Sequence, residues 1–232
     1  AIARDPGSLS YVAEPVPGLW VMALDTCKYE DNLTSGHPET SGAYRPETMT
    51  WALNKLRQAR EMGKQVIALQ HHGLTEHYLG QSQAFGAYVV DGYQTASQTL
   101  ANAGLKFMFT GHYHANDITE TVSETGLPTL FDVETGSLVT YPSPVRFVSL
   151  TGTDAAIHTE YVTKIAYNTG SVSFPDYAYN FLYQGLWGLA QYTLMNQYGL
   201  DAATATYMAP FVADAFAARY AGDEEMGAEA QA

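Results

Sequence analysis

Cysteine is nearly absent from this sequence. Cys27 is the only one in 232 residues, so neither an intramolecular disulfide framework nor a cysteine-rich zinc cluster can form. Cysteine usage therefore does not indicate the cellular compartment. We expect Cys27 to be a small buried apolar residue beside the end of a strand.

Basic residues are also scarce. The chain has 11 Lys and Arg against 24 Asp and Glu, a formal net charge of -13 at pH 7. A surface with this balance repels nucleic acid and anionic lipid, so we expect neither as a partner. Any phosphate group that the protein handles must be attracted by a local positive charge, such as a bound metal ion.

Long hydrophobic runs are missing as well. No stretch of about 18 apolar residues occurs, and no basic-then-apolar signal opens the chain. We therefore expect a soluble protein with no membrane partner. Because the first residue is Ala1 rather than Met, we also expect that an upstream segment was removed. A secreted or periplasmic location would follow if that segment was a signal, and the sequence itself assigns no location.

The part of the chain with clear periodicity begins with alternating strands and helices. Residues 19–24 predict a buried strand, Pro46 opens a helix, and residues 64–70 predict a second strand. A helix over residues 94–103 precedes a third strand over residues 105–110. This order predicts a parallel α/β sheet, in which ligands bind beyond the carboxyl ends of the strands.

The connections and the later part of the chain differ in character. Residues 26–45 are polar and contain Asn, Ser, Gly and Pro, which predicts a long loop of the kind that carries function. Four strands, in an antiparallel arrangement, are expected between residues 118 and 163. Two or three helices follow from Asp176, with Asp201 as a cap and Pro210 as a kink or break. Their apolar content predicts that they pack on the α/β body or on another chain.

Four of the seven histidines lie in two short clusters, each at the end of an apolar strand. His71 and His72 follow the second strand, and His112 and His114 follow the third. In an extended segment the latter two side chains project to the same side and can serve one metal ion or two adjacent ions. Neutral imidazole is a common ligand of zinc and iron, so a metal site is the favoured interpretation. The alternative is that these are hydrogen-bonded structural residues.

The remaining three histidines are interpreted as surface residues or as polar residues satisfied within the fold. They are His37, His77 and His158. His77 lies in the loop after the first histidine pair, near enough in sequence to line a cleft. We do not assign it to the site.

Two segments resemble motifs of the calcineurin-like metallophosphoesterases. VIALQHHGL (residues 66–74) is similar to a motif in which an apolar strand ends in histidine, and FTGHYHAND (residues 109–117) is similar to the Gly-His-x-His motif. LDTCKYEDN (residues 24–32) and ETGSLVTYPSP (residues 134–144) look like a bacterial branch of that superfamily. The resemblance spans most of residues 8–151.

The resemblance implies a fold and a division of the chain. The fold class is α/β: the later part of a two-sheet sandwich flanked by helices, with a C-terminal helical extension. Residues 1–167 would form the C-terminal half of a phosphoesterase domain. Residues 168–232 would form the helical extension, with an acidic tail from Gly222 that is expected to fray.

The resemblance also implies an activity, hydrolysis of phosphate mono- or diesters by two divalent or trivalent transition-metal ions (Zn, Mn or Fe). His71 and His112 would bind one ion and His114 the other. His71 is chosen over His72 because the ligand in this family is the first residue after the strand. His72 would then support a ligand or face the phosphate-ester substrate as a catalytic group. Asp117 would orient a ligand imidazole, with an ordinary loop aspartate as the alternative.

Three earlier motifs of the family do not occur in this sequence: Asp-x-His, Gly-Asp with a bridging Asp, and Gly-Asn-His. Half of the metal ligands are therefore missing. We expect a C-terminal portion of the domain, with a missing N-terminal segment or a second chain covering an otherwise exposed sheet. The isolated chain should then have little activity. The alternative is a non-catalytic binding module with a residual or empty metal site.

Overall fold

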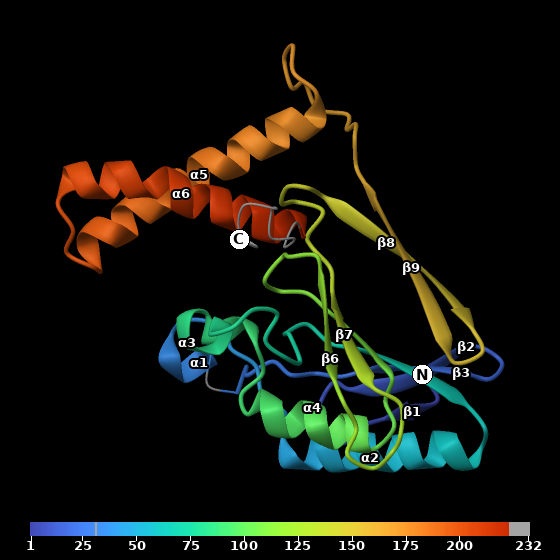
Figure 1. Ribbon diagram of the computed structural model, residues 1–232. Coiled ribbons are helices and arrows are strands. Elements are labelled where there is room, and N and C mark those ends of the chain that lie inside the picture. Colours follow the sequence, from blue (N-terminus) through green and yellow to red (C-terminus); the bar gives the residue numbers. More distant parts are fainter. Residues whose placement is uncertain (31, 223–232) are drawn as a thin grey trace. The chain divides into compact units, whose positions relative to one another are not determined.

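The computed structural model describes residues 1–30 and 32–222. The chain divides into two compact units (Figure 1). Unit 1 consists of residues 1–113 and 117–134, and unit 2 of residues 114–116 and 135–232. A unit is defined by contacts, whereas a domain is defined by its ability to fold alone, so the domain boundary near residue 167 stays a prediction. The expected fraying concerns residues 223–232, which lie outside the described part.

A seven-stranded sheet forms the centre of unit 1, in the order β1-β2-β3-β4-β5-β7-β6. The strands are β1 (Ala3–Arg4), β2 (Tyr11–Val16), β3 (Leu19–Ala23), β4 (Gln65–Leu69), β5 (Phe107–Thr110), β6 (Asp117–Thr121) and β7 (Leu130–Glu134). The strands β3, β4, β5 and β7 are parallel, and the outer strands pair antiparallel. The predicted α/β class with a central sheet is confirmed. Sequence analysis missed β1 and β2, and β7 joins the sheet parallel to β5 rather than in a separate antiparallel portion.

Helices α2 (Pro46–Glu61) and α4 (Tyr93–Asn102) connect the parallel strands. Proline at the first turn and Glu47 beside it favour the start of α2. Ala52, Leu56 and Ala59 are its buried apolar residues, and their spacing of four and three places them on one helical face. Met62, which follows the helix end, is exposed. Three shorter segments complete the unit: α1 (Asn32–Ser35), α3 (Gln81–Ala84) and η1 (Gly86–Tyr88).

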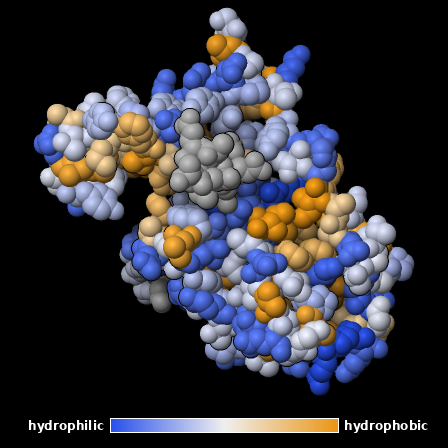
Figure 2. Space-filling view, viewed as in Figure 1, coloured by the Kyte–Doolittle hydropathy of each residue, from blue (hydrophilic) through white to orange (hydrophobic). Residues whose placement is uncertain are grey.

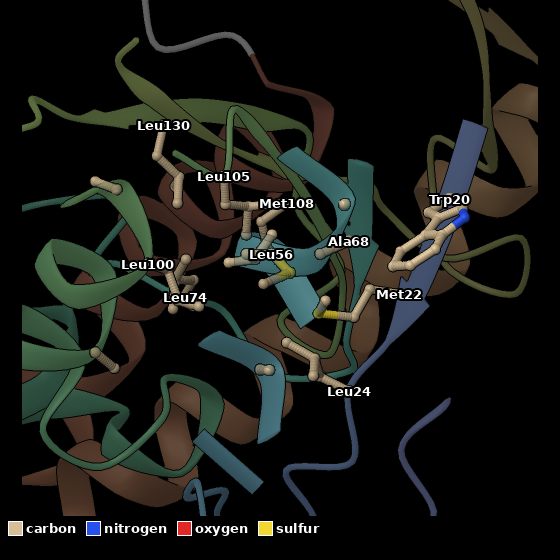
Figure 3. Close-up of a cluster of buried hydrophobic side chains, with 14 of the residues drawn as sticks. Trp20, Met22, Leu24, Leu56, Ala68, Leu74, Leu100, Leu105, Met108 and Leu130 are labelled. Carbon is tan, nitrogen blue, oxygen red and sulfur yellow. The ribbon is translucent and has the colours of Figure 1, made fainter. Parts of the chain in front are cut away.

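The core of unit 1 lies between these helices and one face of the sheet. The register aligns Met22, Ala68 and Met108 across β3, β4 and β5. Figure 3 shows that Leu56 lies close to Ala68 and Met108 and that Leu100 lies beside Leu74, and all of these side chains are buried. Each fully buried large side chain stabilises the fold by about 1.5–3 kcal/mol. This core fixes the positions at which β4 and β5 end.

Unit 2 combines a hairpin with two long helices. The hairpin is β8 (Pro144–Thr151) and β9 (Asp154–Tyr161), and the helices are α5 (Phe174–Asn196) and α6 (Ala202–Ala221). The side chains of Ser173 and Asp201 accept hydrogen bonds from the first turns of α5 and α6, so Asp201 caps its helix as predicted. Pro210 was expected to kink or break this helix; the break is wrong, because α6 continues through Pro210, and the kink stays a prediction.

Cys27 is exposed rather than buried, because it lies in the polar loop after β3 and not in the strand. Within residues 1–30 and 32–222, no helix has the length and apolar character needed to cross a membrane.

Candidate metal centre

His71 and His112 are brought together by the pairing of β4 with β5. Leu69 lies opposite Phe109 in the parallel register, and the pairing continues beyond the strands. The backbone N–H of Gly111 donates to the carbonyl oxygen of His71 over 3.1 Å. The two imidazole rings therefore face each other at the carboxyl end of the sheet, with centroids 4.4 Å apart.

The backbone at His112 is strained. Its φ is 71°, and the N–H of Tyr113 donates to the carbonyl oxygen of Gly111 over 2.9 Å, which forms a three-residue turn centred on His112. Positive φ is rare for a residue with a side chain, and such turns persist where the surrounding structure holds them. The expectation of an extended segment is therefore wrong. Strain of this kind is concentrated at functional sites.

His72 is locked by the polar loop. Its Nδ1 lies 2.7 Å from Thr26 Oγ1 and its Nε2 lies 3.1 Å from the carbonyl oxygen of Thr40. A carbonyl can only accept, so Nε2 carries a proton and Nδ1 accepts from the hydroxyl of Thr26. Burial lowers the pKa of His72 more than the Thr40 hydrogen bond raises it, so the ring is neutral at pH 7. Both nitrogens are engaged, which makes His72 a support for its neighbours rather than a ready ligand.

His71 differs from His72 in exposure and bonding. Its ring packs on those of His72 and His112, whose centroids lie 5.1 and 4.4 Å away, and the residue is exposed. Partial burial lowers the pKa of His71, which favours the neutral form that binds metal. The Nε2 of His112 lies 3.1 Å from the carbonyl oxygen of Thr40, so this single oxygen orients two rings.

The separation of the imidazole centroids indicates whether His71 and His112 could bind the same metal ion. Two imidazoles bound to one tetrahedral ion through bonds of about 2.1 Å have centroids roughly 5 Å apart. The separation of 4.4 Å between His71 and His112 is slightly shorter than that value, and it is the bonding of both His72 nitrogens that leaves His71 and His112 as the pair. Among the described residues, however, no group of three or more His, Cys, Asp or Glu is placed to hold a metal ion. The geometry fits a pair of histidine ligands and not a complete dinuclear set.

His114 belongs to unit 2, where its Nδ1 lies 3.0 Å from Thr140 Oγ1. Its φ is 62°, so it is a second non-glycine residue with left-handed backbone in this motif. A polar partner on one ring nitrogen is typical of ligand histidines, because it fixes the tautomer and the ring orientation. Chain connectivity keeps the Cα atoms of His112 and His114 within about 7 Å of each other.

A buried ionic cluster surrounds His77 and was not predicted. The ring of His77 is fully buried, with Nδ1 2.8 Å from Asp117 and Nε2 3.2 Å from Asp132. Glu134 lies 3.8 Å from the same Nε2. Burial alone would lower the pKa of His77, but the hydrogen bonds to Asp117 and Asp132 and the charge of Glu134 outweigh it and raise the pKa to about 9. The imidazolium is therefore the stable form at pH 7.

The three carboxylates of this cluster reach His77 from β6 and β7. The register places Asp117 opposite Glu134 and Thr119 opposite Asp132, so all four side chains lie on one face of the sheet. Asp132 also accepts hydrogen bonds from the backbone N–H groups of Leu74 and Thr75, over 2.7 and 2.9 Å. Asp117 at the start of DITET, with Asp132 and Glu134 two residues apart in FDVE, was the available signal, but a lone histidine in a loop gave no partner for it. The structure places the Asp117 carboxylate on His77, and its role toward a ligand histidine stays a prediction.

Comparisons with known proteins bear on the fold. Neither protein-family models nor curated proteins match this sequence. Among solved structures, the chain is similar to a dimetal phosphatase from Danio rerio, with a TM-score of 0.50 and 11% sequence identity. The similarity covers 66% of this chain and 58% of the phosphatase chain, so the chain spans less than two thirds of that structure. At this identity the likeness is one of fold, and the chain has the mixed α/β architecture of a dimetal phosphatase.

Proposed function

We propose that this chain carries the histidine part of a metal site that hydrolyses phosphate mono- or diesters. The observation that carries the proposal is the meeting of His71 and His112 at the carboxyl ends of two adjacent parallel strands. The similarity of the fold to a dimetal phosphatase supports the same reaction class.

The proposed roles follow from the contacts of each ring. In the complete site, His71 and His112 bind one ion and His114 binds the second, whereas the isolated chain holds only the first. A bound ion of this kind lowers the pKa of water toward neutrality and offsets the charge of the phosphate. Thr40 orients the imidazole of His112 through its carbonyl oxygen, and Thr140 orients that of His114 through its hydroxyl. His72, whose ring lies 4.8 Å from that of His112, restricts the space beside the ligands.

A second candidate function is a non-catalytic binding module. It is favoured because, within the described ranges, no group of three or more His, Cys, Asp or Glu side chains is placed to hold a metal ion. The sheet face opposite the core also carries a row of half-buried apolar residues, because Val21, Ile67, Phe107 and Phe131 are aligned in register. A missing N-terminal segment or a second chain is the partner that we propose for this face.

Metal binding by the purified chain tests the proposal. We expect isothermal titration calorimetry with ZnCl2 to show one weakly bound ion per chain, together with little hydrolysis of an aryl phosphate ester. The variants His71→Ala and His112→Ala should each weaken the binding more than about 100-fold, since losing a ligand costs more than losing its orienting group. His158→Ala is the matched control, because that side chain is 73% exposed on the hairpin of unit 2.

Three results would decide between the candidates. Two tightly bound ions with rapid turnover that His112→Ala abolishes would show that the chain holds a complete site. Zinc binding that His158→Ala weakens as much as His71→Ala does would overturn the site assignment. A chain that binds no zinc would leave the binding module as the function.

A further inference from the structure

Unit 2 contains an uncharged cavity of about 510 Å3 between the segment 138–143 and helix α5. This volume lies within the range of about 300–1,000 Å3 that is typical of small-molecule sites. The lining side chains are aliphatic or aromatic, with hydroxyl groups as their only polar atoms. They come mainly from Leu138, Val139, Tyr141, Ile165, Phe181 and Leu182. In a chain with a net charge of -13, a cavity lined by no charged residue is suited to a neutral ligand.

Several of the lining side chains are exposed although they are apolar. Val139 is 90% exposed, Phe181 is 73% exposed and Leu138 is 60% exposed. A group of apolar side chains held at the surface around a cavity gains free energy when an apolar ligand removes it from water. Tyr141 and Tyr177 add aromatic surface with a hydroxyl at one end, which suits a ligand that has one polar atom.

The cavity is connected to His114 by one residue. Thr140 lines the cavity, and its Oγ1 lies 3.0 Å from Nδ1 of His114. All of these residues belong to unit 2. A ligand in the cavity is therefore within one side chain of the histidine to which we assign the second metal ion.

We propose that this cavity binds the uncharged, apolar alcohol part of the substrate, which makes the substrate an aryl or branched alkyl phosphate ester. This inference rests on the proposed function, since it places the phosphate group beside His114. Hydrolysis breaks the bond between phosphorus and the alcohol oxygen and forms a bond between phosphorus and the oxygen of water. The proton released by water goes to the departing alcohol oxygen, so a neutral alcohol is left in the cavity.

Binding of the alcohol alone tests the cavity without the metal site. We expect 1-naphthol, followed by NMR line broadening of the full chain without metal, to bind, and glycerol at the same concentration not to bind. Phe181→Ala should weaken naphthol binding about tenfold, because an aromatic contact is lost. Phe211→Ala is the matched control: it is the same substitution at a residue that is 61% exposed in α6 and does not line the cavity.

The outcomes separate the cavity from the metal site. If naphthol does not bind, or if both variants weaken it equally, the inference is overturned whatever the metal experiments show. If naphthol binds at the cavity and 1-naphthyl phosphate binds more tightly in the presence of Zn2+, the inference is supported. If naphthol binds but Zn2+ adds nothing for the phosphate ester, the cavity is not a substrate site and the inference is overturned, while the zinc titrations of the histidine variants test the proposed function separately.

Discussion

Gly42 allows the polar loop to approach the histidine cluster. A Cβ atom at this position would lie 2.4 Å from Nδ1 and 2.5 Å from Cγ of the His72 ring. The ring cannot move aside easily, because Thr26 and Thr40 hold its two nitrogens. Backbone hydrogen bonds fix the loop as well, since Ala43 donates to Thr26 and Asp91 donates to Gly42. The space at this residue is therefore reserved for the imidazole.

The substitution Gly42→Ala should consequently disturb the site. We expect it to lower the free energy of unfolding by about 1–3 kcal/mol, the usual cost of overpacking, and to weaken zinc binding by displacing Thr40. Urea denaturation and zinc titration measure the two effects. Gly86→Ala is the control, because a Cβ there meets no atom within 4 Å. Equal stability of the two variants would show that His72 is not tightly held.

The ionisation of His77 should make the free energy of unfolding depend on pH between about 6.5 and 9, where few other side chains titrate. Its pKa is raised from 6.5 to about 9 in the folded chain, by hydrogen bonds and charge from β6 and β7. A raised pKa means that the stabilisation is complete below pH 6.5 and is lost as the pH rises through 9. The size of the shift corresponds to a contribution on the order of 3 kcal/mol.

We therefore expect the free energy of unfolding to fall between pH 6.5 and 9, as measured by urea denaturation at several pH values. In His77→Gln the protein should be less stable at pH 6.5 and its stability should change little over this range. His158→Gln, at an exposed position, should keep the pH dependence of the unchanged chain. A flat profile for the unchanged chain would mean that His77 is neutral when folded.

At the scale of elements, α5 and α6 form a helical hairpin held by small residues. The buried residues of α6 are Ala205, Ala209, Ala213 and Ala217, and their spacing of four places them in one stripe. Such a stripe lets two helices approach closely. The other faces of the pair carry exposed apolar residues such as Leu189 and Phe211, and Figure 2 shows hydrophobic surface on this part at the left of the view.

Removal of residues 168–232 should cost solubility or folding. The reason is that α5 and α6 pack on each other through buried alanines and supply much of the apolar surface of unit 2, so their loss removes the partner of the remaining apolar residues of that unit. Thermal melting and analytical ultracentrifugation of the shortened chain measure the effect. A shortened chain that stayed monomeric and melted at the same temperature would contradict a structural role.

Point substitutions in α6 test the contact between α5 and α6 without removing any part of the chain. Ala209→Leu overpacks the stripe and should lower the melting temperature, whereas Met208→Leu on the half-exposed side should not. Packing of these helices on the α/β body or on another chain stays a prediction.

For the whole molecule, more of the fold than of the candidate site could be predicted from the sequence. The strands that end at Leu69 and Thr110, the helix that begins at Pro46 and the α/β class all follow from local signals. The short strands β1 and β2 did not, because two to six residues with Pro15 among them carry little periodicity. Of the site, the nearness of His71 and His112 followed from the expected parallel pairing. The bonds that hold His72 and the burial of His77 did not.

The sequence by itself determined the parallel sheet and the positions of the histidines at its carboxyl edge, because both depend on the order of neighbouring residues, and it determined the acidic charge, which follows from composition. Tertiary structure alone decided which side chains meet across long separations in the chain. Thr40 bonds His72 and His112, and Asp117 and Asp132 bond His77. No local pattern encodes these contacts, since they depend on how a loop folds back on the sheet, and they set which imidazoles are neutral, which is charged and which is ready to bind a metal ion.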